Sequence, residues 1–346
     1  MKSNGREVNM SEEVKQKAGK LLTDMAGFIS TRTMAMGLEL ELFQELTNHP
    51  NGITVDDLAK LKNLDPFYLG VWCKSAYGSE LLESNGNSKY TLAPHIETLL
   101  LNRDFPGYIG GIPKVFTSAE MFDTFPANMQ SGKRTWWDKL SPNWIKSVIE
   151  TTRPMYTRFL NVGIGKVPGL EEKMQNGHIM ELASGAGDGL TRTALKYPNS
   201  TFVGVDGDEF SIKLAEEATS KLNLSNRVKY HKSTFEDIDY KDEFDVVTIN
   251  ASMHECRDLD KVTTNVLKSL KSGGSFVISD FPYPAGLDGL RTIPGRIMTG
   301  IQFFESQIDD LLMPTQDFVD LLNKNGFREV GAFDISPTHN VIYGTN

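Results

Sequence analysis

The feature that most constrains the fold is an alternation of short apolar strands with helical segments, which begins near residue 178. The strand-like runs are HIMELA, TFVGVD, RVKYHKS, FDVVTINAS and SFVISD. Because parallel strands need helical crossovers, this pattern predicts an α/β domain with a parallel sheet covered by helices on both faces. A helix at 315–327 and two β-rich stretches joined by Pro337 follow. We expect that pair of stretches to close the sheet edge in antiparallel fashion.

The first hundred residues have a different pattern, mainly helical with one short strand. A helix is expected over 21–47, and the stretch 48–52, NHPNG, should end it. Thr54 and Asp57 form a capping box for a second helix, and Asp65-Pro66 begins a third. A polar turn and the strand KYTLA complete the order of elements that is typical of a winged helix-turn-helix.

The stretch between these two regions contains a glycine-rich loop, followed by helices expected at 135–140 and 142–160. We therefore divide the chain into a winged-helix domain over 1–105, a helical bridge over 106–170 and the α/β domain over 171–346. Aromatic side chains crowd the bridge, and ligand pockets are mostly apolar. They are candidates to line a pocket: Phe116, Phe122, Phe125, Trp136, Trp137, Trp144 and Tyr156. Tyr156 is the strongest candidate among them.

The glycine-rich motif Glu181-Leu-Ala-Ser-Gly-Ala-Gly-Asp-Gly189 leaves the first strand of the α/β domain and enters a helix. Glycine there permits a tight turn and lets a ligand approach the backbone. Asp206 ends the next strand, where a carboxylate can accept hydrogen bonds from ribose hydroxyls. A dinucleotide fingerprint requires a third glycine at position 190, which is leucine. The motif therefore favours a nucleoside without a pyrophosphate.

These segments resemble the motifs of class I S-adenosylmethionine-dependent methyltransferases. The glycine-rich segment resembles their first motif, VGVDGD the second, FDVVTINASMHE the fourth and LKSGGSFVISD the fifth. The resemblance implies a Rossmann-like seven-stranded sheet whose last strand is antiparallel, and S-adenosyl-L-methionine as cofactor. Ala183 stands where many members have glycine, and Ser233-Thr234 where many have Gly-Asp, so the adenine contact is left open. The resemblance implies this set of cofactor-binding residues: Glu181, Ala183, Gly185, Gly187, Asp206, Gly207, Thr234, Phe235 and Asn250.

The whole chain resembles small-molecule O-methyltransferases with an N-terminal winged-helix dimerisation domain. In that group a histidine after the fourth motif is the general base, and His254 occupies this place. The resemblance therefore implies catalysis by His254 with Glu255 beside it, contact of Tyr156 and His254 with the acceptor, and a homodimer. The group's orienting acid is replaced here by Met313-Pro314, so S-methylation of a thiol or thioether, which needs little or no base, stays an alternative.

Charge and cysteine content limit other classes of function. The net charge is −9 and the predicted third helix of the winged-helix region contains one lysine, Lys74, and no arginine. This disfavours nucleic acid as a partner, although a winged-helix DNA-binding regulator and a non-catalytic ligand-binding module are kept as alternatives. Cys73 and Cys256 form no metal or disulfide motif, and we expect no metal. With no signal peptide or membrane span in the sequence, we expect a cytoplasmic location.

Overall fold

A computed structural model describes residues 11–346 except 85, 87 and 136–138. The chain divides into two compact units, Met1–Asn102 and Arg103–Asn346. The first boundary therefore lies close to the expected end of the winged-helix region. The expected bridge over 106–170 belongs to the same compact unit as the α/β region, and its separate status stays a prediction.

The N-terminal unit consists of five helices and a small antiparallel sheet among its described residues. Its elements are α1 (Glu12–Glu39), α2 (Leu42–Thr47), β1 (Ile53–Thr54), α3 (Val55–Lys62), α4 (Pro66–Gly78), β2 (Leu82–Ser84), β3 (Lys89–Leu92) and α5 (Ile96–Leu100). The strand order is β1-β3-β2. The order of elements from α2 to β3 is helix, strand, two helices and a hairpin. This is the order expected for a winged helix.

Local sequence explains where these helices begin. The Thr54 hydroxyl accepts the amide of Asp57 at the start of α3, and the Asp65 carboxylate accepts the amides of Phe67 and Tyr68 at the start of α4. Both predicted caps are present. The predicted start of the first helix at residue 21 is wrong, because α1 begins at Glu12 behind an Ser11 cap. Its first turns lack an apolar stripe but contain strong helix formers, so periodicity alone missed them.

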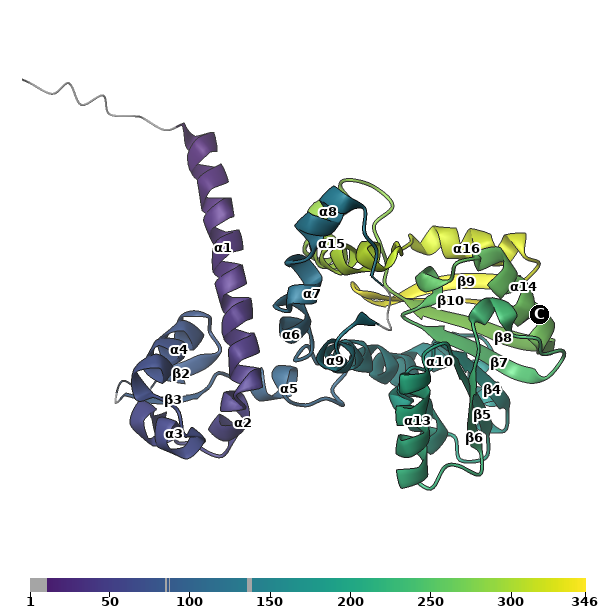
Figure 1. The fold of residues 1–346 in the computed structure, drawn as a ribbon, viewed down its shortest axis with the longest axis horizontal. Coiled ribbons are helices and arrows are strands. Elements are labelled where there is room, and N and C mark those ends of the chain that lie inside the picture. The colour runs from purple at the N-terminus through teal and green to yellow at the C-terminus, as the bar shows by residue number, and fades with distance from the viewer. Residues whose placement is uncertain (1–10, 85, 87, 136–138) are drawn as a thin grey trace, which may run out of the picture. The chain divides into compact units, whose positions relative to one another are not determined.

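The larger unit is built on a mixed seven-stranded sheet of order β6-β5-β4-β7-β8-β10-β9 (Figure 1). The strands are β4 (His178–Leu182), β5 (Thr201–Asp206), β6 (Val228–Lys232), β7 (Phe244–Asn250), β8 (Leu270–Asp280), β9 (Arg328–Ser336) and β10 (His339–Thr345). Neighbouring strands from β6 to β8 pair in parallel, whereas β10 pairs antiparallel with both β8 and β9. This confirms the expected Rossmann-like sheet with its antiparallel last strand.

The described part of this unit also contains helices, some of which pack on the sheet. They are α6 (Ile112–Phe116), α7 (Ala119–Phe122), α8 (Phe125–Ser131), α9 (Pro142–Arg158), α10 (Ile164–Lys166), α11 (Leu170–Gln175), α12 (Asp188–Lys196), α13 (Glu209–Lys221), α14 (Leu259–Ser269), α15 (Ile293–Glu305) and α16 (Thr315–Lys324). One buried cluster joins the sheet to α14 and α16, and another joins it to α11 and α12. The predicted helix at 135–140 lies partly outside the described residues, and α15 was not expected.

Candidate active site

A cavity of about 550 Å³ opens where the first parallel strands end. Open α/β sheets bind ligands at this edge, beyond the carboxyl ends of their strands. The lining comes from the loops after β4, β5, β6 and β7, from α9, and from residues beyond α15. The cavity therefore has one end beside the glycine-rich loop and another beside Ser252 and Glu255, which flank His254 in the chain.

The glycine-rich loop turns through the left-handed backbone region. Ala183, Gly185 and Gly187 have φ of 55°, 50° and 78°. Ala183 therefore holds a backbone conformation that favours glycine. A Cβ added at Gly187 would lie 2.6 Å from the Tyr230 hydroxyl, so this glycine is also required by packing.

Asp206 fixes the loop from the end of β5. Its carboxylate accepts the amides of Gly185 and Asp208, each at 2.8 Å. Burial raises the pKa of Asp206, although these backbone amides act against that shift. The residue also lines the cavity together with Gly207, so one carboxylate both holds the loop and borders the cavity.

Glu181 stands behind the cavity wall and is almost fully buried. The Tyr156 hydroxyl donates to Glu181 Oε1 at 2.5 Å, and Asn250 Nδ2 donates to the same oxygen at 3.2 Å. Burial raises the pKa of Glu181 to about 7 despite these two hydrogen bonds. Tyr156 and Asn250, which both line the cavity, thus form a polar wall backed by a buried acid.

Several buried polar atoms at this end lack a hydrogen-bond partner among the described residues. They are Ser184 Oγ, Asp188 Oδ2 and Asn250 Oδ1, and all three residues line the cavity. Buried polar atoms in native proteins are nearly always satisfied. Their place in residues that line the cavity fits a ligand that carries an amino-acid tail and ribose hydroxyls, as S-adenosylmethionine does.

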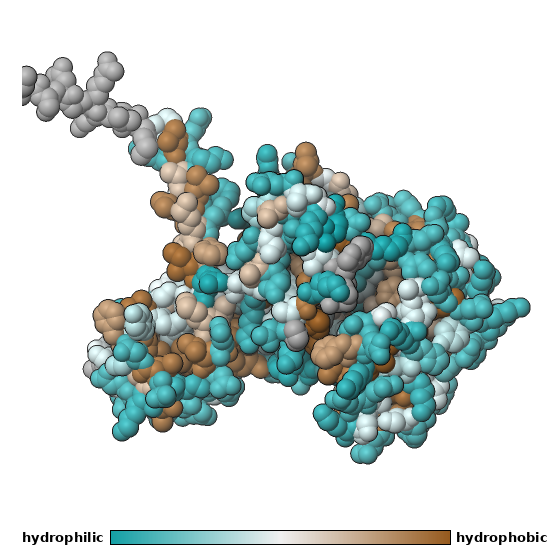
Figure 2. Space-filling view, in the orientation of Figure 1, coloured by the Kyte–Doolittle hydropathy of each residue, from teal (hydrophilic) through white to brown (hydrophobic). Residues whose placement is uncertain are grey.

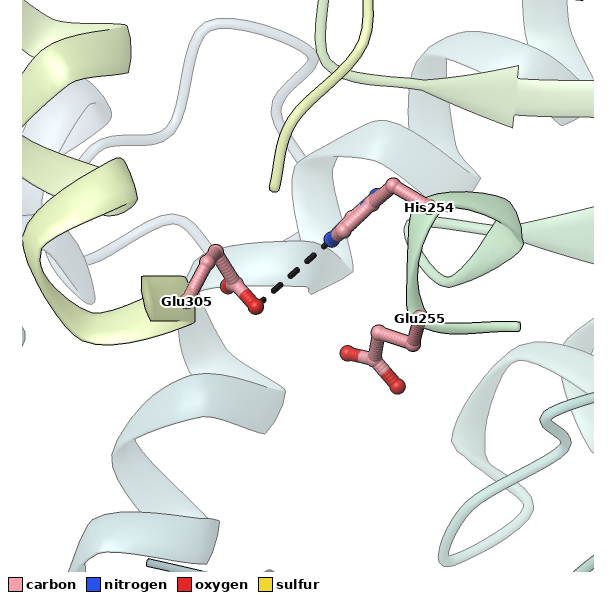
Figure 3. A group of neighbouring side chains, drawn as sticks. All are labelled: His254, Glu255 and Glu305. Carbon is pink, nitrogen blue, oxygen red and sulfur yellow. Dashed lines mark ion pairs between the residues drawn. The ribbon is translucent and has the colours of Figure 1, made fainter. Parts of the chain in front are cut away.

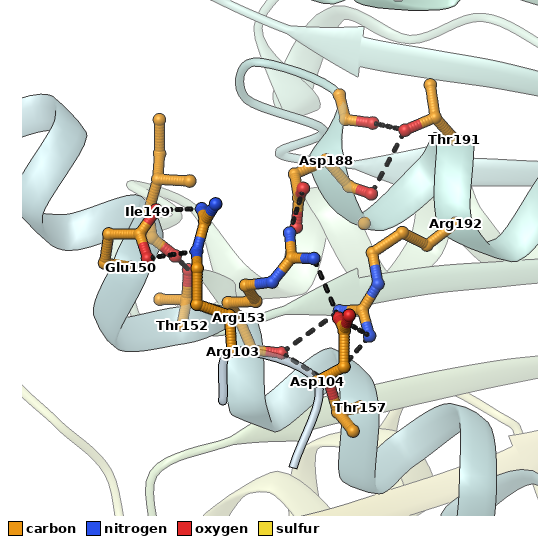
Figure 4. A network of polar contacts seen from close by, with 12 residues as sticks. Arg103, Asp104, Ile149, Glu150, Thr152, Arg153, Thr157, Asp188, Thr191 and Arg192 are labelled. Carbon is orange, nitrogen blue, oxygen red and sulfur yellow. Dashed lines mark hydrogen bonds and ion pairs between the residues drawn. The ribbon is translucent and has the colours of Figure 1, made fainter. Parts of the chain in front are cut away.

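Figure 4 shows a charged network that joins the glycine-rich loop to α9. The Arg153 guanidinium donates to Asp188 at 2.5 Å and to Asp104 at 2.8 Å. Arg192 donates to the Thr157 hydroxyl at 2.7 Å and lies 3.7 Å from Asp104. These contacts fix α9 against the first turn of α12, and therefore fix the side chains that α9 presents to the cavity.

Helix α9 supplies the apolar wall of the cavity. The lining residues from this helix are Ile145, Val148, Ile149, Thr152 and Tyr156. Among the predicted aromatic residues that the structure describes, Tyr156 lines this cavity and the others do not. Phe122 and Phe125 pack instead on Phe303, and Trp144 packs on Phe304. Phe116 joins the same cluster, while Trp136 and Trp137 lie outside the described residues. The aromatic rings pair with α15, an element that the sequence analysis did not expect.

His254 lies in a short 3-10 turn after β7 and is almost completely buried. Its Nδ1 lies 2.9 and 3.1 Å from the two carboxylate oxygens of Asp280, the last residue of β8. Its Nε2 lies 3.7 Å from Glu305, the last residue of α15. Met313-Pro314 indeed offers no acid, but Asp280 orients the imidazole from another element. An acid can thus act from a neighbouring strand end, which a linear motif does not reveal.

Figure 3 shows Glu255 and Glu305 pointing toward the same space as the His254 ring. One polar atom from each of the three side chains lies within 4.8 Å of the other two. An oxygen placed between them would be within hydrogen-bonding reach of all three. Glu255, which the sequence analysis placed beside His254, therefore shares this space with both His254 and Glu305.

Protonation in this cluster departs from ordinary values. Burial by itself lowers the pKa of His254, but the facing carboxylates of Asp280 and Glu305 raise it well above its usual value. Burial, with Glu305 nearby, raises the pKa of Glu255 well above its usual value as well. His254 thus retains its proton to a higher pH than a free imidazole does.

The cavity wall contains most of the residues predicted from the sequence. They are Tyr156, Ala183, Gly185, Asp206, Gly207, Thr234, Phe235, Asn250 and Glu255. Glu181, Gly187 and His254 stand outside the lining.

Sequence reasoning missed the aliphatic residues of α9, together with Arg257 and Asp310, which also line the cavity. The charged pair Arg257–Asp310, 2.7 Å apart, forms only through the fold. Thr234 stands where the resemblance places the adenine contact, and its hydroxyl donates a hydrogen bond to Asp237 Oδ2 at 2.7 Å.

Comparisons with known proteins agree with this architecture. A family described as "Methyltransferase domain" matches residues 173–313. The chain is 28% identical over 191 residues to the ubiquinone/menaquinone biosynthesis C-methyltransferase UbiE of Rickettsia akari, covering 50% of this chain and 75% of that protein. The fold also resembles that of solved structures, two of which are described here.

The first of these structures is PigF with SAH, which has a TM-score of 0.73 and 13% identity, over 97% of this chain and 100% of that one. The second is the mitomycin 7-O-methyltransferase MmcR, with the same scores and the same shares covered. At this identity the likeness is one of fold. The family match shows that residues 173–313 carry a methyltransferase domain, and the solved structures show that the chain has the fold of class I S-adenosylmethionine-dependent methyltransferases.

Proposed function

We propose that the chain transfers a methyl group to a hydroxyl oxygen of a small molecule held against α9. The observation that carries this proposal is the buried contact between His254 Nδ1 and Asp280, which leaves Nε2 facing Glu305 at 3.7 Å with Glu255 nearby. An imidazole fixed by a carboxylate on one nitrogen is arranged to accept a proton on the other. A hydroxyl acceptor needs such a base, because its own pKa lies well above neutrality.

The cofactor, when bound, supplies an electrophilic methyl group on a sulfonium. Glu181, Asp188 and Asn250 would hold its amino-acid tail, and Asp206 would accept its ribose hydroxyls. Ala183, Gly185 and Gly207 line the cavity and would give it backbone access, and Thr234 and Phe235 would border the adenine end. Gly187 would support the loop from outside the lining. The apolar wall of α9 excludes water from the acceptor. Unpartnered polar atoms on this wall and loop support the assignment.

The proton path uses side chains at the acceptor end. The acceptor hydroxyl enters the space bordered by His254, Glu255 and Glu305, and its proton passes to His254 Nε2 as the oxygen forms its new bond to carbon. Asp280 stabilises the imidazolium that results. A positioned base contributes roughly 10²–10⁴-fold to such a reaction. Tyr156 supports the acceptor from α9.

S-methylation stays the second candidate. A thioether loses no proton and requires only positioning. The carboxylate-fixed histidine is an argument for the hydroxyl, and the name of MmcR, a mitomycin 7-O-methyltransferase, supports oxygen as the acceptor atom. The relative UbiE is named as a C-methyltransferase, so carbon belongs in any screen of acceptors.

Methyl transfer from labelled S-adenosylmethionine to a panel of phenols, hydroxy acids, thiols and thioethers tests the proposal. His254→Gln should lower kcat by about 10²–10⁴-fold while cofactor affinity holds. Because the pKa of His254 is raised above 6.5, the unprotonated base accumulates only above that pH. The rate in the native protein should therefore rise with pH through a midpoint higher than a free imidazole gives. A pH-independent rate in both proteins would reject the base and favour S-methylation.

We also propose that the N-terminal unit pairs two chains into a homodimer. Figure 2 shows apolar residues along α1, where Leu22, Met25 and Phe28 are more than half exposed. On α4, the third helix of the winged-helix order, Phe67 and Tyr68 are each 74% exposed. Exposed apolar side chains suit a protein partner better than phosphate groups. Light scattering of the native protein should give a dimer, and Phe28→Asp together with Met25→Asp should give a monomer.

No helix among the described residues is long and apolar enough to cross a membrane.

A further inference from the structure

We propose that Glu305 is a positioning residue that keeps His254 protonated, and so unable to act as a base, while the acceptor site is empty. The inference rests on the proposed hydroxyl methylation, in which His254 receives the acceptor proton. It assigns a role to a residue that lies outside the cavity lining and outside every sequence motif.

The facing atoms of His254 and Glu305 contact each other away from solvent and without other hydrogen-bond partners among the described residues. His254 Nε2 and Glu305 Oε2 are both buried, and neither has a hydrogen-bond partner among the described residues. They lie 3.7 Å apart, with the side chains 1% and 8% exposed. Because neither atom has another partner in place of water, a protonated imidazole and an ionised carboxylate stabilise each other at this distance.

Glu305 is held in place by its neighbours at the end of α15. The Gln307 amide oxygen accepts from Thr124 and Asn128, and its nitrogen donates to the carbonyl oxygens of Glu120 and Phe303. Gln307 is itself buried. This network ties the end of α15 to α7 and α8, so the Glu305 carboxylate stays directed at the imidazole.

The charges around His254 come from several elements. Asp280 faces Nδ1 from β8, Glu305 faces Nε2 from α15, and Glu255 neighbours it in the same turn. Asp310, beyond α15, is paired with Arg257 at 2.7 Å. Burial opposes a charged imidazole, yet the carboxylates outweigh burial and raise its pKa. Asp280 and Glu305 act on opposite nitrogens, so the protonated ring satisfies both.

An acceptor hydroxyl that reaches Nε2 must take the place of this ion pair. The oxygen would enter the space bordered by His254, Glu255 and Glu305, and separate the imidazole from the carboxylate. Loss of the Glu305 contact removes one reason for the ring to keep its proton. As the pair separates, the Nε2 proton leaves with the Glu305 carboxylate, and the neutral ring can then accept the proton of the acceptor hydroxyl.

The test is a titration of the His254 ring by NMR, followed through its Cε1 proton and assigned by the loss of that signal in His254→Gln. The protein is titrated with and without S-adenosylhomocysteine. Glu305→Gln should move the midpoint to lower pH by on the order of one pH unit, the size expected from one opposite charge about 4–6 Å away. Glu305→Asp retains the charge and should retain most of the native midpoint.

Asp309→Asn serves as the matched control, because Asp309 is an exposed acid close by in sequence that pairs with Arg134. It should leave the midpoint of His254 unchanged. Glu305→Ala gives a second neutral variant if the glutamine variant folds poorly. An unchanged or higher midpoint in both neutral variants overturns the proposal.

The pH dependence of kcat separates this inference from the function on which it rests. In Glu305→Gln the rising limb of the rate should move to lower pH together with the NMR midpoint. A shifted NMR midpoint with no methylation of any hydroxyl acceptor supports the hold of Glu305 on His254 and counts against hydroxyl methylation. A shifted rate profile with a fixed NMR midpoint overturns the inference.

Discussion

The two ends of the cavity are built in different ways. The cofactor end consists of one loop and the adjoining strand end, in which Gly185 and Asp206 meet through a backbone amide. The proposed acceptor end has the apolar face of α9 in the cavity wall, and His254, Asp280 and Glu305, which come from three different elements, meet just outside the lining. One end recognises its ligand mainly with backbone and a single carboxylate, whereas the other depends on long-range placement of side chains.

This difference separates binding from chemistry. A loop whose geometry is determined by local glycines can bind the same cofactor in many proteins. The acceptor end can change without disturbing that loop, because its residues come from α9, β8 and α15. Substitutions at one end should therefore alter cofactor affinity, and substitutions at the other should alter the rate.

The largest expected effect lies at the acceptor end. Asp280→Asn removes the charge that stabilises the His254 imidazolium, and should lower kcat by on the order of 10²–10⁴-fold, the range of a general base. Cofactor affinity, measured by calorimetry, should stay unchanged. Asp245→Asn is the control, since Asp245 lies at the other end of a strand and pairs with Lys271. A parallel loss of affinity and rate would show that the two ends are not separate.

A smaller effect is expected at the cofactor end. Asp206→Ala removes a charged acceptor of hydrogen bonds and the support of the Gly185 amide, so S-adenosylmethionine should bind more weakly by roughly 1.5–3 kcal/mol. Calorimetric titration measures this. Glu209→Ala, which removes an exposed acid paired with Lys232, should bind normally. Normal affinity in a folded Asp206→Ala protein would remove this residue from the site.

The smallest effect is expected on stability, at the contact between Gly189 of the cofactor end and Tyr156 of α9. A Cβ at Gly189 would lie 1.9 Å from the Tyr156 ring, so Gly189→Ala must displace a ring that is bonded to Glu181. Overpacking of this kind costs typically 1–3 kcal/mol. Urea unfolding should show that loss in the native background and almost none in a Tyr156→Ala background. Gly165→Ala, whose Cβ would meet nothing within 4 Å, is the control. Equal losses in both backgrounds would reject the coupling.

Regular segments with local signals were predictable. The sheet strands, the caps at Thr54 and Asp65 and the antiparallel last strand follow from periodicity, cap chemistry and family motifs. The start of α1 and the existence of α15 were not. Helix α1 begins in a polar stretch without periodicity, and α15 begins after a loop rich in glycine and proline.

The sequence by itself determined the class of the α/β domain and most of the residues around the cofactor loop. Those residues are close in sequence or lie at strand ends, so backbone geometry brings them together. Only the tertiary structure decided that Asp280 and Glu305 flank His254, and that the aromatic rings pack on α15 while aliphatic residues line the cavity. These contacts join distant segments through packing and burial, and no local spacing in the chain encodes them.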